Sequence, residues 1–144
     1  MQQEYRLMKK ILIIICISFI YCCNKDKDPF PDAYVNEYIS PNNPEFNGLN
    51  SPGNSAYITG GVNGIIIFHD YFDEYIAYDR ACRNDPNESC EQVYLDENEI
   101  NTLSCYCCDS KYFIFDGSVI QGPAQRALYR YQTSFNGVQL RIYN

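Results

Sequence analysis

The feature that most constrains this chain of 144 residues is where its cysteines lie. Three of them crowd into the run Cys105-Tyr106-Cys107-Cys108, and Cys82 and Cys90 lie a short way upstream. The two cysteine loops, residues 79–90 and 105–110, each border a strong strand-forming run, so a β-sheet would present both loops at one end. Thiols gathered in this way predict either disulfides or a metal site.

The rest of the sequence predicts an all-β fold built from short antiparallel strands. No window has convincing helical periodicity, and residues 96–103 would form one helical turn at most. Asp116-Gly117 and Asn136-Gly137 are typical of tight hairpin turns. Eight apolar or alternating runs are expected as strands: residues 34–39, 55–59, 64–68, 75–78, 92–95, 111–115, 128–133 and 138–143. The continuous apolar run at 64–68 predicts a strand that is buried on both faces.

The N-terminal segment predicts export. A basic stretch precedes an apolar run at residues 11–20, which is too short to span a bilayer comfortably and fits the core of a signal peptide. The segment ends in Tyr21-Cys22-Cys23 and resembles bacterial lipoprotein signals, in which a cysteine after the apolar core carries the lipid. A small residue is preferred before that cysteine, so Cys23 is the expected site and Cys22 the alternative. A plain cleaved signal or a single anchor helix remains the other interpretation.

The expected organisation is a signal peptide at 1–22, a tether at 23–33 and one β domain at 34–144. Without residues 1–22 the chain has eight Lys and Arg against seventeen Asp and Glu, a formal charge of −9. Such a charge argues against nucleic acid and against anionic membrane surfaces as partners. The lipid anchor itself places the protein on a bacterial membrane, and the outer membrane is the expected one, at its periplasmic or surface face.

Residues 55–143 resemble the Rieske domain family. In that family a Cys-x-His loop and a Cys-x-x-His loop hold a two-iron, two-sulfur cluster. The resemblance implies an antiparallel β-sandwich with two cysteine-bearing loops at one end. It is carried, in the family's order and spacing, by Tyr78-Asp79-Arg80-Ala81-Cys82, Cys105-Tyr106-Cys107-Cys108-Asp109-Ser110-Lys111-Tyr112-Phe113, Asp116-Gly117-Ser118-Val119, Gly122-Pro123-Ala124 and Ala127-Leu128-Tyr129-Arg130-Tyr131.

Position by position, the resemblance places Cys82 and Cys105 at the two cysteine ligands. Asn84 and Cys108 stand where the two histidine ligands belong, and Asp109 replaces the usual glycine. The only histidine of the chain, His69, falls in a predicted turn away from both loops, where we expect an exposed side chain. The ligand set of a Rieske cluster therefore cannot be completed within this chain.

Three thiols, those of Cys82, Cys105 and Cys108, remain in the ligand positions. No cofactor is expected, but these thiolates are of the type that an atypical two-iron, two-sulfur cluster or zinc would accept. The fourth ligand would then be Asp79, Asp109 or water.

The resemblance also implies disulfides. Cys90 and Cys107 match a pair that bridges the two loops in one branch of the family. Without metal, Cys82 and Cys105 could form a second bridge, with a Cys105–Cys108 bridge as the competitor.

The expected function is that of a non-enzymatic binding or accessory protein, because no catalytic dyad, triad or phosphate loop is evident. Two alternatives stay open. One is an electron-transfer protein with an atypical cysteine-rich metal site, and the other is a thiol–disulfide redox protein that uses Cys105 and Cys108. The sequence does not name a protein or redox partner.

Overall fold

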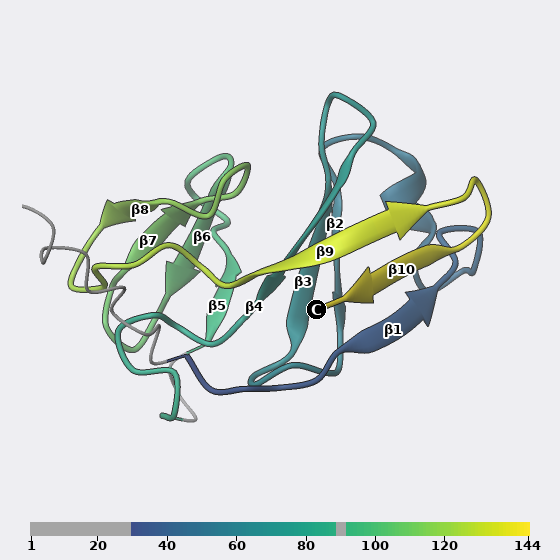
Figure 1. Ribbon diagram of the computed structural model, residues 1–144. Coiled ribbons are helices and arrows are strands. Elements are labelled where there is room, and N and C mark those ends of the chain that lie inside the picture. The colour runs from purple at the N-terminus through teal and green to yellow at the C-terminus, as the bar shows by residue number, and fades with distance from the viewer. Residues whose placement is uncertain (1–29, 89–91) are drawn as a thin grey trace, which may run out of the picture.

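The computed structural model describes residues 30–88 and 92–144. Two antiparallel sheets make up this part of the chain, and no α-helix occurs in it (Figure 1). The strands are β1 Asn36–Ile39, β2 Ser55–Ile58, β3 Ile65–His69, β4 Tyr75–Asp79, β5 Val93–Leu95, β6 Thr102–Cys105, β7 Lys111–Phe113, β8 Val119–Gln121, β9 Arg130–Phe135 and β10 Leu140–Tyr143, and a short 3-10 helix, η1, covers Asn47–Asn50. None of the helical structure in the two described ranges is long and apolar enough to cross a bilayer. The predicted all-β antiparallel class is confirmed.

The larger sheet joins the first strand to the last. Its order is β1-β10-β9-β4-β3-β2, so that β1 pairs with β10 and β4 pairs with β9. The smaller sheet has the order β5-β6-β7-β8, in which every pair joins strands that are neighbours in the sequence. An antiparallel bridge between Ala81 and Gln92 connects the end of β4 to the start of β5. The two cysteine loops are thereby brought to the same region of the fold.

The hairpin of β3 and β4 lies between two cores. Every residue of both strands is buried, and alternate side chains point to opposite faces. One face, with Ile66 and Tyr78, belongs to a core shared with Leu103 and Tyr112 of the smaller sheet. The other face belongs to a core shared with β1, β9 and β10. The run at residues 64–68 is thus buried on both faces, as predicted.

Two strands, β6 and β8, have no counterpart among the predicted runs. β6 occupies Thr102–Cys105, and all four of its residues are buried. It overlaps the end of residues 96–103, where the sequence predicted one helical turn at most. Thr, Leu, Ser and Cys alternate between polar and apolar residues, but a run of four residues is a weak signal, and all four side chains are buried. The pairing of β6 with β5 and β7 therefore defines this strand, more than its own short sequence pattern does.

His69 is buried, and the prediction of an exposed turn histidine is wrong. The residue ends β3 and is only 3% exposed. Its ring stacks on Tyr75, its partner across the hairpin, with centroids 4.5 Å apart. Nε2 lies 2.9 Å from a carboxylate oxygen of Asp73. Cross-strand stacking therefore covers the ring, although the turn begins at the next residue.

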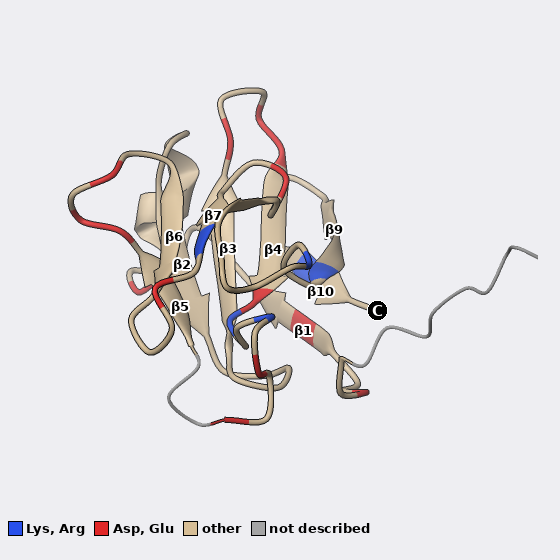
Figure 2. Cartoon of the chain, turned by 90° about the vertical axis from the view of Figure 1, so that its left-hand side faces the viewer, with Lys and Arg blue, Asp and Glu red and all other residues tan. Residues whose placement is uncertain are grey.

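Acidic side chains are most numerous away from the cysteine loops, although Asp85, Glu88 and Asp109 lie within those loops. Figure 2 shows acidic residues in the turn between β3 and β4 and in the loop between β5 and β6. These two segments adjoin the first residues of β4 and β6, whereas the cysteines lie at or beyond the last residues of the same strands. The acidic residues are Asp70, Asp73 and Glu74 in the turn, and Asp96, Glu97 and Glu99 in the loop. The end opposite the cysteines is therefore strongly acidic, whereas the cysteine-bearing end carries Arg83 and Arg126 beside its acidic residues.

Candidate metal centre

Three cysteine side chains meet at one end of the domain. Cys82 follows β4, Cys105 ends β6, and Cys108 lies in the turn before β7. Their sulfur atoms all lie within 4.8 Å of one another, and the sulfurs of Cys82 and Cys108 are 3.4 Å apart. All three are thiols, two of them buried and Cys108 half-buried. The expectation that one end of the fold presents both cysteine loops is confirmed.

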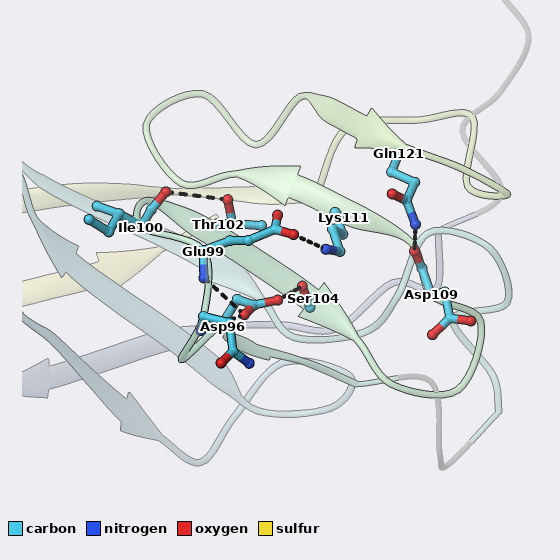
Figure 3. Close-up of polar contacts among 9 residues, drawn as sticks. Asp96, Glu99, Ile100, Thr102, Ser104, Asp109, Lys111 and Gln121 are labelled. Atoms are coloured by element: carbon cyan, nitrogen blue, oxygen red, sulfur yellow. Dashed lines mark hydrogen bonds and ion pairs between the residues drawn. The ribbon is translucent and has the colours of Figure 1, made fainter.

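The turn that carries Cys108 is closed by backbone hydrogen bonds. The N–H of Cys105 donates to the carbonyl of Ser110 and the N–H of Asp109 donates to the carbonyl of Cys105, both at 2.9 Å. Asp109 has a φ of 58°, in the left-handed region that favours glycine and that Asp tolerates better than most residues. The side-chain amide of Gln121 on β8 donates to the Asp109 carbonyl at 2.9 Å (Figure 3). The turn therefore keeps a glycine-type backbone although it lacks the glycine.

Two hydroxyl groups contact the sulfurs from behind. The Tyr112 hydroxyl lies 3.2 Å from the Cys82 sulfur and accepts the N–H of Arg83 at 3.1 Å. The Ser110 hydroxyl lies 3.2 Å from the Cys108 sulfur and accepts the N–H of Ala124 at 2.9 Å. Burial, and then the contact with Cys82, hold the pKa of Tyr112 well above its usual value. These hydroxyls fix the positions of two of the three sulfurs.

The environment of Cys105 disfavours a thiolate unless a cation is near. Burial raises the pKa of its thiol from 9.0 to about 11, against the opposing effect of the backbone N–H groups of Cys107 and Cys108. A soft metal ion supplies the missing positive charge, since metal binding requires the deprotonated sulfur. The donor set of three sulfurs is therefore suited to a thiophilic ion.

The two carboxylates offered by the sequence as a fourth ligand do not join the sulfurs. Asp79 is fully buried. Its Oδ2 accepts the N–H of Val62 at 2.6 Å and the Tyr131 hydroxyl at 2.7 Å. Its Oδ1 accepts the N–H of Asn63 at 3.2 Å and that of Ala81 at 2.8 Å. Because both of its oxygens accept hydrogen bonds, Asp79 positions the start of the Cys82 loop and is not a ligand. The Asp109 side chain is exposed and does not join the group of three sulfurs.

The remaining predicted positions are more scattered. Asn84 is exposed and lines a pocket of about 430 Å³ between residues 83–87 and 123–126, beside the thiols. Cys107 is exposed and disulfide-bonded. The pairing of Cys107 with Cys90 stays a prediction because Cys90 lies outside the described residues, as do Cys22 and Cys23.

The described residues do not fit a histidine-ligated cluster. Asn84 and Cys108 stand where the resemblance to the Rieske family would place the two histidines, and His69 lies opposite Tyr75, at the far end of β4 from Cys82. At about 3.3 Å per strand residue, roughly 13 Å separate the two ends of β4, and Cys82 lies three residues beyond the second end. Ligands on different irons also lie on opposite sides of a two-iron cluster, whereas Cys82 and Cys108 nearly touch.

One metal ion fits the sulfurs better. A Zn–S bond is about 2.3 Å, so two sulfurs on one tetrahedral zinc ion lie roughly 3.8 Å apart. The observed sulfur pair at 3.4 Å, in a group within 4.8 Å, needs only small shifts to reach that geometry.

Comparison with known proteins gives few matches. No protein-family model and no curated protein sequence matches the chain. Among solved structures it is similar to the ferredoxin of carbazole 1,9a-dioxygenase from Nocardioides aromaticivorans IC177, at 15% identity and a TM-score of 0.46, over 65% of this chain and 86% of the ferredoxin. Neither value reaches the level that would assign a family, so the residues of the site carry the interpretation that follows.

Proposed function

We propose that the chain is an exported, lipid-anchored, non-enzymatic protein whose Rieske-like domain binds a single soft metal ion, zinc, in place of an iron–sulfur cluster. The observation that carries this proposal is the group of three thiols, of Cys82, Cys105 and Cys108, within 4.8 Å of one another. Three thiolates leave one position for water or an external ligand.

Export favours zinc over a cluster. The signal lacks a twin-arginine pair, so the chain would cross the membrane unfolded and leave a cytoplasmically assembled cluster behind. Zinc has no redox chemistry of its own and can enter after the domain has folded. Bound zinc would also keep three thiols reduced in a compartment that allows disulfides.

Metal analysis of the mature protein, purified anaerobically from its own host, tests this proposal. We expect about one zinc per chain and no Rieske-type electron paramagnetic resonance signal after reduction. Cys108→Ser should weaken zinc binding at least 100-fold in a competition titration, whereas Asn84→Ala, in the exposed position nearby, should change it less than about threefold. Iron and sulfide in a two-to-two ratio, or equal zinc affinity in both variants, would contradict the proposal.

The anchor has its own test. Changing both Cys22 and Cys23 to Ser should release the protein from the membrane fraction, and the N-terminal peptide of the unchanged protein should carry an acyl mass. Unchanged fractionation without any acyl mass would leave the plain secretory signal or the anchor helix as the explanation.

Thiol–disulfide exchange is the second candidate, favoured by the 3.4 Å between the sulfurs of Cys82 and Cys108. A disulfide bond is about 2.05 Å long, so the pair needs little movement to close. When the Cys82–Cys108 disulfide forms, the two cysteines pass two electrons and two protons to a disulfide of the partner. The partner disulfide is thereby reduced to two thiols. Non-reducing peptide mapping after zinc removal would show a Cys82–Cys108 bridge and not the Cys82–Cys105 or Cys105–Cys108 bridges that the sequence suggests.

A further inference from the structure

The described chain begins with a residue that is fastened to the cysteine-bearing end. Phe30 is 8% exposed and stacks on Tyr129 with ring centroids 4.6 Å apart and planes within 5°. The guanidinium carbon of Arg83 lies 4.8 Å from the centre of the Phe30 ring. The chain is therefore attached to the domain at Phe30, before β1 begins at Asn36.

Phe30 is also connected to the thiols through Arg83. Arg83, which covers its ring, follows Cys82 directly and donates its N–H to Tyr112, the residue whose hydroxyl touches the Cys82 sulfur. Figure 1 shows the start of the described chain, the loop after β4 and the turn between β6 and β7 at the same end of the molecule. The attachment point of the tether and the metal centre thus share one end.

The tether is short compared with the domain. Seven residue steps separate Cys23 from Phe30, and they span at most roughly 25 Å when fully extended. A compact domain of this length has a radius of gyration of about 13 Å and is therefore roughly 35 Å across. A lipid on Cys23, or on Cys22 one step earlier, leaves too little chain to reach around the domain, so the domain cannot turn over.

We infer that the thiol-bearing end of the domain faces the lipid headgroups of the membrane that holds the anchor. This inference rests on the lipid anchor proposed above. The facing surface includes residues 83–88, 106–109 and 122–126, where Arg83 and Arg126 lie among the acidic residues Asp85, Glu88 and Asp109. The acidic β3–β4 turn and β5–β6 loop then lie on the side away from the membrane, where anionic headgroups do not repel them (Figure 2).

This orientation limits what reaches the metal centre. The acidic end is exposed to proteins that diffuse in solution, whereas the bilayer blocks their access to the thiols. Small ions can still enter from the side through the gap that the tether allows. The metal is therefore gained or lost as a small ion or through a component of the same membrane.

The absence of tryptophan from the chain gives a direct test. Asn87→Trp places one reporter at the thiol end and Asn98→Trp places one at the acidic end. The two sites are matched, because both side chains are exposed and each backbone N–H donates to an aspartate two residues earlier, at 3.2 Å and 2.8 Å. Each lipidated full chain is incorporated into phosphatidylethanolamine–phosphatidylglycerol vesicles that contain a dansyl-headgroup lipid, and energy transfer from tryptophan is measured after flotation.

We expect several-fold more transfer from the Asn87→Trp variant than from the Asn98→Trp variant. Insertion of about twelve Gly and Ser residues between Asp28 and Pro29 adds roughly 40 Å of reach and should remove most of that difference. Equal transfer from the two variants, or more from Asn98→Trp, in vesicles that float with the protein would overturn the orientation while the anchor stands. Failure to float would overturn the anchor, and the orientation with it. Zinc binding is measured separately and is affected by neither result.

Discussion

The two sheets of this domain are held together in different ways. The larger sheet is closed by pairings between distant parts of the chain, with Asn36 opposite Tyr143 and Ala77 opposite Tyr131. The smaller sheet contains only pairings between successive strands, and three of its four strands are three residues long. Short strands with local pairings have few contacts of their own. The larger sheet should therefore be stable without metal, whereas the smaller sheet should depend on the metal ion proposed to bind its cysteines.

The largest expected effect comes from Asp79, where the two sheets meet. Asp79→Ala removes the acceptor of four hydrogen bonds at a fully buried position. Leaving several buried donors without an acceptor should lower the free energy of unfolding by at least about 4 kcal/mol. Asp70→Ala, at the other end of the hairpin, removes two backbone contacts and should lower it by about 1–2 kcal/mol. Urea denaturation measures the free energy of unfolding of both variants. Equal decreases would show that Asp79 contributes no more to stability than Asp70 does.

A pair of core substitutions separates the sheets. Leu103→Ala in the smaller sheet and Leu140→Ala in the larger one both truncate fully buried side chains, and each should lower the free energy of unfolding by about 3 kcal/mol. Zinc affinity should fall about tenfold or more for Leu103→Ala and change little for Leu140→Ala. Isothermal titration with zinc checks this, and equal losses of affinity would mean that the two sheets respond as one unit.

A matched pair of tyrosines refines the comparison. Tyr112 and Tyr131 are both buried, and their hydroxyls contact Cys82 and Asp79 respectively. Replacing either with Phe should lower the free energy of unfolding by about 1 kcal/mol. Only Tyr112→Phe should weaken zinc binding, by about tenfold, because it supports a ligand. An unchanged zinc affinity in Tyr112→Phe would show that the hydroxyl does not position the sulfur.

The smallest expected effect is a response of the smaller sheet to acid. A hydrogen bond from the Ser104 hydroxyl, followed by one from the N–H of Asn98, lowers the pKa of Asp96 below its usual 3.8. A lowered pKa stabilises the fold above pH 3.8, and that stabilisation is lost as the pH falls through the folded-state value. Between pH 5 and pH 2.5, Asp96→Asn should therefore lose slightly less stability than the unchanged protein. Glu97→Gln, an exposed change in the same loop, is the control and should behave like the unchanged protein.

Much of the fold could be predicted from local patterns. The runs at 64–68 and 75–78 became β3 and β4 because strongly apolar segments have few alternatives to a buried strand. β6 could not be predicted, since its four buried residues include Thr102 and Ser104 and its identity comes from its neighbours. The burial of His69 was missed for a similar reason, as it depends on the ring of Tyr75 across the hairpin.

The candidate site was predictable in its ligands but not in its supports. The thiols of Cys82, Cys105 and Cys108 could be found from spacing and resemblance, because the chemistry of cysteine is distinctive. Tyr112 and Asp79 could not, since an alternating strand pattern does not say which residue a hydroxyl or carboxylate will meet. Their contacts join positions 30 and 52 residues apart, which only the folded chain brings together.

The pairing of the first strand with the last bears on how the protein would fold during the export proposed above. A chain that emerges from its N-terminus can form the β2–β3–β4 pairings early, because they are local. β1 has no partner until β10 has emerged, and the edge of β4 stays open until β9 covers it. An open edge on a strand this apolar is a template for aggregation. The emerging chain should therefore need a chaperone in the interval between the release of β4 and the release of β9.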